Sequence, residues 1–439
     1  MILDGLFRDP TLSDLLSDQQ RLAYLLEVEL ALAEGLAAAG FCHIEDVLAL
    51  RQHCAQFKPD LTALQRGMTQ DGVIIPALVK ALRVGLAPAP ARALHFGATS
   101  QDIMDTATVL EARAVLAHFE HLLRDLVVAL LPLMQQHQQD LVAGRTRSQQ
   151  AAPINLGLKI ARWLEPLLRQ LERLEPLRQD VLHLQLAGAA GNCAAYQDRA
   201  QTVRQVMAEH LQLQAQGGWH TQRDRIQQLS HWCATTSTAL GKMALDWMLM
   251  AQSEVGECLL SNGGGSSTLP HKSNPVTAEI IQTLARRAAQ QAAELQLSGL
   301  AAHERDGVAW SHEWLALPEL YQMTGAALQH SHTGLQHLTF DTQQMMHNLW
   351  ASRGLLFAET LRFQLETTQH SNAAQIIDTC IAQLRSQTNT NTDLLDLVNA
   401  QAGTTFTRQS LTTDLLHAGC TQEDIERVLS RAQAWLPHV

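Results

Sequence analysis

The sequence predicts an all-α protein built around a long central helical bundle. Alanine, leucine and glutamine dominate the chain, whereas the β-branched residues that favour strands are sparse. Apolar residues mostly recur at intervals of three and four, which is the period of an α-helix. Several segments with this period exceed about 25 residues, a length typical of helical bundles. No alternating strand run of any length is apparent, so no sheet is expected.

The predicted helices follow one another along most of the chain. They cover residues 19–39, 43–56, 101–138, 154–186, 196–213, 222–258, 275–302 and 312–337. A chain of 439 residues is too long for one compact core. The expected domains are residues 1–100 (N-terminal helical), 101–340 (the long-helix bundle) and 341–439 (small C-terminal helical). Long helices with apolar residues on more than one face also predict self-association.

Composition excludes several functional classes. The net charge of −11 argues against a surface for nucleic acid or anionic membranes. No apolar run reaches the roughly 18 residues of a membrane span, and the start lacks the features of a signal peptide. Seven dispersed cysteines indicate reduced thiols in a cytoplasmic protein. The 20 histidines show no metal-ligand spacing, so neither a metal nor another cofactor is expected.

The most informative segment is the glycine-rich stretch 263–275, which leads directly into a predicted helix. Asn274 can cap that helix and Pro275 suits its first turn. The N-terminus of a helix attracts anions, and Lys272 adds a positive charge within reach of Ser266. An ordinary loop of this composition is the alternative. A phosphate-binding P-loop is excluded, because proline and histidine rather than glycine precede the lysine.

A second helix start lies at residues 95–102. Thr99 and Asp102 have the spacing of a capping box, which alone would explain them. The alternative is functional: the hydroxyls of Thr99 and Ser100 and the helix N–H groups hold a substrate carboxylate, with His95 beside them.

Three further segments supply cations and amides. Residues 144–153 carry Arg147 and Gln149, and a solvated arginine on a loop is the alternative reading there. Residues 218–226 carry Arg223, which either reaches a pocket or joins a structural ion-pair cluster. Residues 303–314 carry Arg305, a further candidate for binding carboxylates.

Taken in order, these segments resemble motifs of the fumarase/aspartase superfamily. Residues 265–275 match the pattern G-S-S-x-[ML]-P-x-K-x-N-P over nearly all positions, and residues 95–102 resemble H-x-G-x-T-S-x-D. Residues 218–226 and 303–314 are similar to runs found in its 3-carboxy-cis,cis-muconate cycloisomerases. The resemblance extends from about residue 16 to at least Glu359. It implies a three-domain fold and a homotetramer whose active sites draw residues from three subunits.

The resemblance also implies chemistry on a small polycarboxylate without a cofactor. Such enzymes make or break a bond beside a carboxylate through a doubly charged aci-carboxylate intermediate, which fixed donors stabilise. The implied catalytic residues are Ser266, Lys272 and His95. The implied substrate-binding residues are Thr99, Ser100, Arg147, Gln149, Asn274, Arg223 and Arg305.

Arg147 decides between branches of the superfamily. Adenylosuccinate and argininosuccinate lyases carry a histidine for acid/base chemistry at this place, and an arginine cannot exchange protons near neutrality. The expected activity is therefore the cyclisation of 3-carboxy-cis,cis-muconate to a carboxymuconolactone, in the catabolism of protocatechuate. An adenylosuccinate-type lyase is the alternative, disfavoured also by Ser273 in place of arginine. A non-catalytic scaffold, as in lens crystallins, is the third reading.

Overall fold

The computed structural model describes residues 2–261, 264–265, 269, 272–386, 392–416 and 419–436. The described chain is predominantly helical, which confirms the all-α prediction. It divides into two compact units: unit 1 comprises Met1–His121, Leu171–Ser237 and Leu284–Ala326, and unit 2 comprises Leu122–Gln170, Thr238–Thr283 and Ala327–Val439. The division into three domains stays a prediction. Within the described ranges, no helix is both long and apolar enough to span a membrane.

Five long helices have residues in both units. They are α8 (Ser100–Gln136), α9 (Leu156–Glu172), α12 (Asp224–Met250), α13 (Val276–Leu297) and α14 (Gly307–Gln336). The other elements of unit 1 are α1 (Asp4–Phe7), α2 (Pro10–Leu15), α3 (Asp18–Ala38), α4 (Ile44–Gln56), α5 (Leu61–Asp71), α6 (Ile75–Arg83), α7 (Pro88–Ala93), α10 (Leu174–Val181), the 3-10 helix η1 (Ala194–Arg199) and α11 (Ala200–Leu211).

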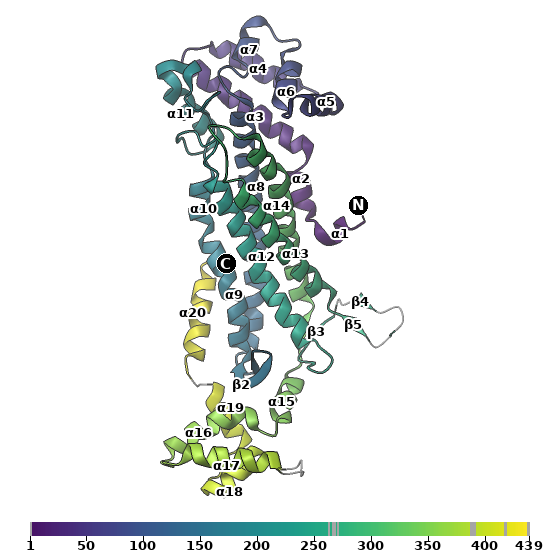
Figure 1. The fold of residues 1–439 in the computed structure, drawn as a ribbon, viewed down its shortest axis with the longest axis vertical. Coiled ribbons are helices and arrows are strands. Elements are labelled where there is room, and N and C mark those ends of the chain that lie inside the picture. Colours follow the sequence, from purple (N-terminus) through teal and green to yellow (C-terminus); the bar gives the residue numbers. More distant parts are fainter. Residues whose placement is uncertain are drawn as a thin grey trace. The chain divides into compact units, whose positions relative to one another are not determined.

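Helix α3 is the centre of the core of unit 1. The hydroxyl of Ser17 caps it by accepting a hydrogen bond from the backbone N–H of Gln20. Its apolar side chains, such as Leu25 and Leu32, are fully buried among residues of α4, α6, α8 and α11. A Cβ at Gly35 would lie 2.7 Å from a backbone oxygen of α11, so glycine permits the close approach of these two helices (Figure 1).

The other elements of unit 2 combine short strands with a group of short helices. They are β1 (Leu141–Thr146), β2 (Gln149–Asn155), β3 (Cys258–Leu260), β4 (Gly264–Gly265), β5 (Ser273–Asn274), β6 (Leu338–Phe340), α15 (Thr342–Ala351), the 3-10 helix η2 (Leu355–Phe357), α16 (Ala358–Thr367), α17 (Ala373–Ser386), α18 (Leu394–Ala402), α19 (Arg408–Leu416) and α20 (Thr421–Gln433). Apolar residues of α15 to α19 and of β1 form one hydrophobic cluster of this unit.

The structure corrects two predictions about local conformation. Strands β1 and β2 form an antiparallel hairpin where no strand was expected. The helix predicted over residues 222–258 ends at Met250, and β3, which begins at Cys258, pairs with β6. The predicted helix 154–186 is also wrong in its middle and at its C-terminal end: α9 and α10 are separated at Arg173, and residues 182–186 are not helical. The bundle helices themselves lie close to the predicted ranges.

The start of α13 is shifted by one residue from its prediction. The carbonyl of Pro275 accepts the first helical hydrogen bond, from the N–H of Glu279, so the N-cap position belongs to Pro275. Asn274 lies in β5 and pairs with Gly264 of β4. The two strands bring the ends of the glycine-rich segment together at the start of the helix.

Candidate active site

The first turn of α8 carries the polar groups predicted to hold a carboxylate. The carboxylate of Asp102 accepts a hydrogen bond from the backbone N–H of Thr99 at 2.9 Å, which is one half of the predicted capping box. The hydroxyl of Thr99 instead accepts a hydrogen bond from Nη1 of Arg305, at 2.6 Å. Ser100 is half-buried at the first position of the helix. An arginine therefore lies at the positive end of a 37-residue helix.

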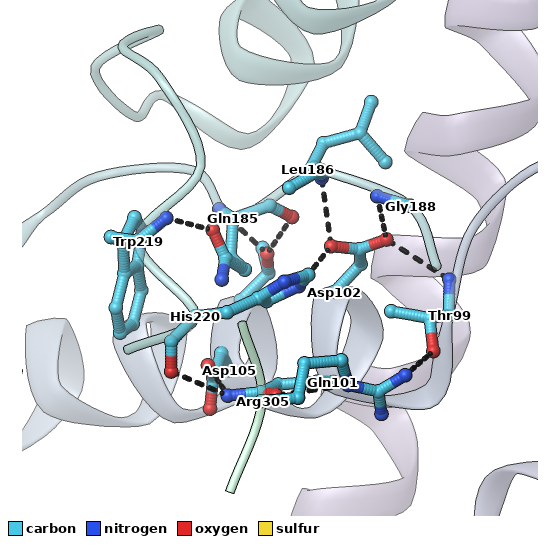
Figure 2. A network of polar contacts seen from close by, with 12 residues as sticks. Thr99, Gln101, Asp102, Asp105, Gln185, Leu186, Gly188, Trp219, His220 and Arg305 are labelled. Carbon is cyan, nitrogen blue, oxygen red and sulfur yellow. Dashed lines mark hydrogen bonds and ion pairs between the residues drawn. The ribbon is translucent and has the colours of Figure 1, made fainter. Parts of the chain in front are cut away.

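Asp102 holds this turn in place through hydrogen bonds to its side chain. Its side chain is fully buried and accepts four hydrogen bonds, two on each oxygen. The donors are the N–H of Ala187 (2.8 Å) and Nε2 of His220 (2.8 Å) on Oδ1, and the N–H groups of Gly188 and Thr99 (both 2.9 Å) on Oδ2. Figure 2 shows these contacts converging on one carboxylate. Asp102 is thus a structural acceptor, and its capacity is filled by the protein itself.

A glutamine links this network to Arg305. The side-chain oxygen of Gln101 accepts a hydrogen bond from Nε of Arg305 at 3.4 Å (Figure 2). Its amide nitrogen donates to the carbonyl of His220 at 3.0 Å and to Oδ2 of Asp105 at 3.1 Å. Arg305 is itself exposed, so its guanidinium is held at one edge and open to solvent at the other.

Arg223 lies in a buried ion-pair cluster. Its guanidinium donates to both oxygens of Asp105 and to both oxygens of Glu313, with Nη1 at 2.7 Å from Asp105 Oδ2 and Nε at 2.8 Å from Glu313 Oε1. Burial alone would lower the pKa of the guanidinium, but the two carboxylates raise it above its usual value. Trp310 donates to Asp105, and the ring of Trp219 lies against the guanidinium. The predicted substrate-binding role of Arg223 stays a prediction, with four of its five N–H donors already used.

His95 pairs with a carboxylate that no local motif indicated. Its Nδ1 lies 2.7 Å from Oε1 of Glu29, which is fully buried on α3. Burial disfavours the charged imidazole, but the hydrogen bond and charge of Glu29, together with Asp102, outweigh it and raise the pKa of His95. His95 precedes Ser100, the first residue of α8, by five positions.

The candidates in unit 2 lie on two hairpins. Arg147 and Ser148 form the two-residue turn between β1 and β2, both with positive φ, as in a type I′ turn. Arg147 and Gln149 are exposed, which agrees with the reading of a solvated arginine but leaves a role in binding open. Lys272 is exposed and Asn274 half-buried beside β4. Ser266 lies outside the described residues.

Sequence reasoning missed several of the groups that organise the site. His220 and Gln101 lay inside segments that had been singled out, so their position in these motifs was an available signal. Glu313 also lay inside such a segment, residues 303–314, whereas Glu29 gave no signal, because it meets His95 only through the tertiary fold. Among the described residues, no group of three or more His, Cys, Asp or Glu side chains is placed to hold a metal ion.

Comparison with known proteins gives a consistent picture. A family model described as "Lyase" matches residues 10–289. The chain is 35% identical over 370 residues to the 3-carboxy-cis,cis-muconate cycloisomerase of Acinetobacter baylyi, covering 82% of each chain. It is 34% identical to a trans-aconitate decarboxylase of Mycosarcoma maydis, over 83% of this chain and 75% of the other. The crystal structure of beta-carboxy-cis,cis-muconate cycloisomerase from Acinetobacter calcoaceticus is similar, with a TM-score of 0.89, 30% identity and coverage of 98% of this chain and 100% of that one.

Proposed function

The chain belongs to the lyase family, within the fumarase/aspartase superfamily, and from this we propose that it is a 3-carboxy-cis,cis-muconate cycloisomerase. The observation that carries the chemistry is the contact of Arg305 with Thr99 at the start of α8. It puts a cation and the positive end of a helix dipole at one place, as the binding of a carboxylate requires. The relatives of that name supply the choice of substrate.

The proposed reaction is internal to the substrate. One carboxylate oxygen adds to the conjugated diene and closes a five-membered lactone, and the displaced π electrons form an aci-carboxylate until the neighbouring carbon takes up a proton. Because nucleophile and electrophile share one molecule, the enzyme has to fix the reactive conformer and stabilise developing charge. Three carboxylates on the substrate explain the number of cationic and amide candidates around the site.

Every predicted site residue except Arg223, whose guanidinium is engaged by Asp105 and Glu313, has a proposed role in this reaction. Thr99, Ser100 and Arg305 bind one carboxylate at the start of α8. Arg147, Gln149 and Asn274 bind the others. In the proposed catalytic step, the hydroxyl of Ser266 delivers the proton, and Lys272 stabilises the serine in its deprotonated form. His95 donates a hydrogen bond to a substrate carboxylate.

The test is a spectrophotometric assay with purified protein and EDTA. Incubation with 3-carboxy-cis,cis-muconate should remove the ultraviolet absorbance of the diene and yield a lactone. Adenylosuccinate and trans-aconitate are run in parallel, with release of fumarate and of carbon dioxide as the readouts. An active protein that leaves the diene intact but cleaves adenylosuccinate would establish the lyase alternative. Carbon dioxide from trans-aconitate alone would indicate a decarboxylase.

The cellular setting is proposed on the same basis. We propose a cytoplasmic homotetramer that draws each active site from three subunits. Large apolar side chains are exposed on the bundle helices, which supports self-association; they include Leu245 and Leu249 on α12, Leu297 on α13 and Leu315 on α14.

A further inference from the structure

We propose that Glu29 is the positioning residue of His95, holding the imidazole so that its Nε2–H faces the substrate as a hydrogen-bond donor. The inference rests on the proposed function of His95 in a polycarboxylate site. It stands on one short contact, 2.7 Å between Nδ1 of His95 and Oε1 of Glu29. The two ring nitrogens point to opposite sides of the imidazole, so fixing one of them directs the other.

The two partners of this contact differ in their exposure to solvent. The carboxylate of Glu29 is completely inaccessible to solvent, whereas the imidazole of His95 keeps 18% of its surface exposed. Glu29 lies on α3 beside Val28 and Leu32, which are also completely buried. The partner of His95 therefore belongs to the rigid core of unit 1, and the exposed part of the imidazole is the part available to a ligand.

The carboxylate of Glu29 does not favour the stability of the fold. Its second oxygen, Oε2, is buried without a hydrogen-bond partner among the described residues. An unsatisfied buried polar group costs about 1–3 kcal/mol, and more when it is charged. Local arrangements that oppose stability are typical of functional sites. A requirement to orient and charge His95 accounts for a buried glutamate at this position.

The charged surroundings favour the imidazolium form. Asp102 on α8 faces His95 along with Glu29, and both raise its pKa, whereas Arg83 at the end of α6 opposes them. Burial raises the pKa of the Tyr196 hydroxyl in η1, and the charges of Asp102 and Glu29 add to this effect, so the hydroxyl stays neutral. His95 thus carries its proton at pH values where an isolated imidazole has lost part of it.

The test combines kinetics with a readout that does not need turnover. In the wild type, kcat/KM should fall at alkaline pH as His95 loses its proton. In Glu29→Gln, the charge is lost and this alkaline limb should move down by about one pH unit or more. Glu29→Asp keeps the charge, and its alkaline limb should lie between those of the wild type and Glu29→Gln. The pKa of His95 itself is measured by deuterium exchange at its Cε1, read by mass spectrometry on the peptide that carries it.

A matched pair elsewhere in unit 1 supplies the control. His118 and Asp9 also lie 2.7 Å apart, with a completely buried carboxylate and an imidazole that is 14% exposed. Asp9→Asn should leave the alkaline limb in place. A uniform loss of activity in Glu29→Gln, with the pKa of His95 unchanged, would overturn the proposal. If the wild type fails to convert the muconate, the proposed function falls, and the exchange measurement alone then decides whether Glu29 controls His95.

Discussion

At the scale of single residues, Asp102 connects the start of α8 to two other segments of the chain. Its four hydrogen bonds tie the start of α8 to residues 187–188 and to His220. Hydrogen bonds to charged groups contribute about 1.5–3 kcal/mol each to stability. Losing one in a buried place lowers the free energy of unfolding by more than losing an exposed ion pair does. The carboxylate therefore fixes the turn on which Thr99 and Ser100 are presented.

Replacing Asp102 by asparagine should destabilise the protein by at least about 3 kcal/mol. The amide nitrogen cannot accept, so two of the four donors would face an N–H₂ group inside the core. The free energy of unfolding from urea titration measures the effect. Asp71→Asn, at the exposed end of α5, is the control and should change it by less than about 0.5 kcal/mol. A loss below 1 kcal/mol in Asp102→Asn, about the value for one neutral hydrogen bond, would contradict this account.

At the scale of elements, the start of α8 depends on a glycine in the preceding turn. Gly97 has a φ of +74°, and an added Cβ would lie 2.5 Å from the ring of Tyr196. The hydroxyl of Tyr196 donates to the carbonyl of Phe96 at 3.0 Å, so the ring cannot move away without breaking this bond. The turn between His95 and Thr99 thus requires a residue without a side chain at position 97.

Gly97→Ala should therefore lower both stability and substrate binding. The left-handed conformation alone costs about 1–2 kcal/mol, and the displaced ring adds to it. We expect a loss of about 2 kcal/mol or more in urea unfolding and a higher KM for the muconate. Gly5→Ala in α1, where no atom lies within 4 Å of the added Cβ, controls for the change in composition. Equal behaviour of the two variants would show that the turn tolerates a side chain.

The elements also show what the sequence could and could not predict. Long helices were predicted because their period is repeated many times over. The hairpin β1–β2 was missed because its strands do not alternate between buried and exposed residues: the first three residues of β1 are buried and the first three of β2 are exposed. Arg147 was singled out from its motif, yet its place at the tip of that hairpin required the structure.

The same limit applies to the candidate site. Thr99 and Ser100 could be named from the local sequence, because a helix start leaves a pattern there. Arg305 was named from the resemblance of residues 303–314 to a motif of the superfamily. Glu29 could not, since it meets His95 across 66 positions of the chain. Arg223 was recognised as either a ligand or an ion-pair residue, and its partners Asp105 and Glu313 come from helices that no local rule joins to it.

At the scale of the whole molecule, the predicted site residues are divided between the two units. His95, Thr99 and Arg305 belong to unit 1, whereas Arg147 and Lys272 belong to unit 2. The homotetramer proposed above would complete each site with residues from different subunits. In such an arrangement an isolated subunit would lack part of every site, so activity would require the assembled oligomer.

Subunit mixing tests this arrangement directly. His95→Gln and Ser266→Ala variants should each be inactive alone, and equimolar mixtures should regain activity after exchange of subunits. If His95 and Ser266 of one site come from different chains, about a quarter of the sites receive both intact residues, since each has an even chance of coming from the suitable variant. If both come from one chain, no site is complete. Mass spectrometry of mixed tetramers with isotope-labelled subunits verifies exchange, and verified exchange without recovered activity would refute the shared site.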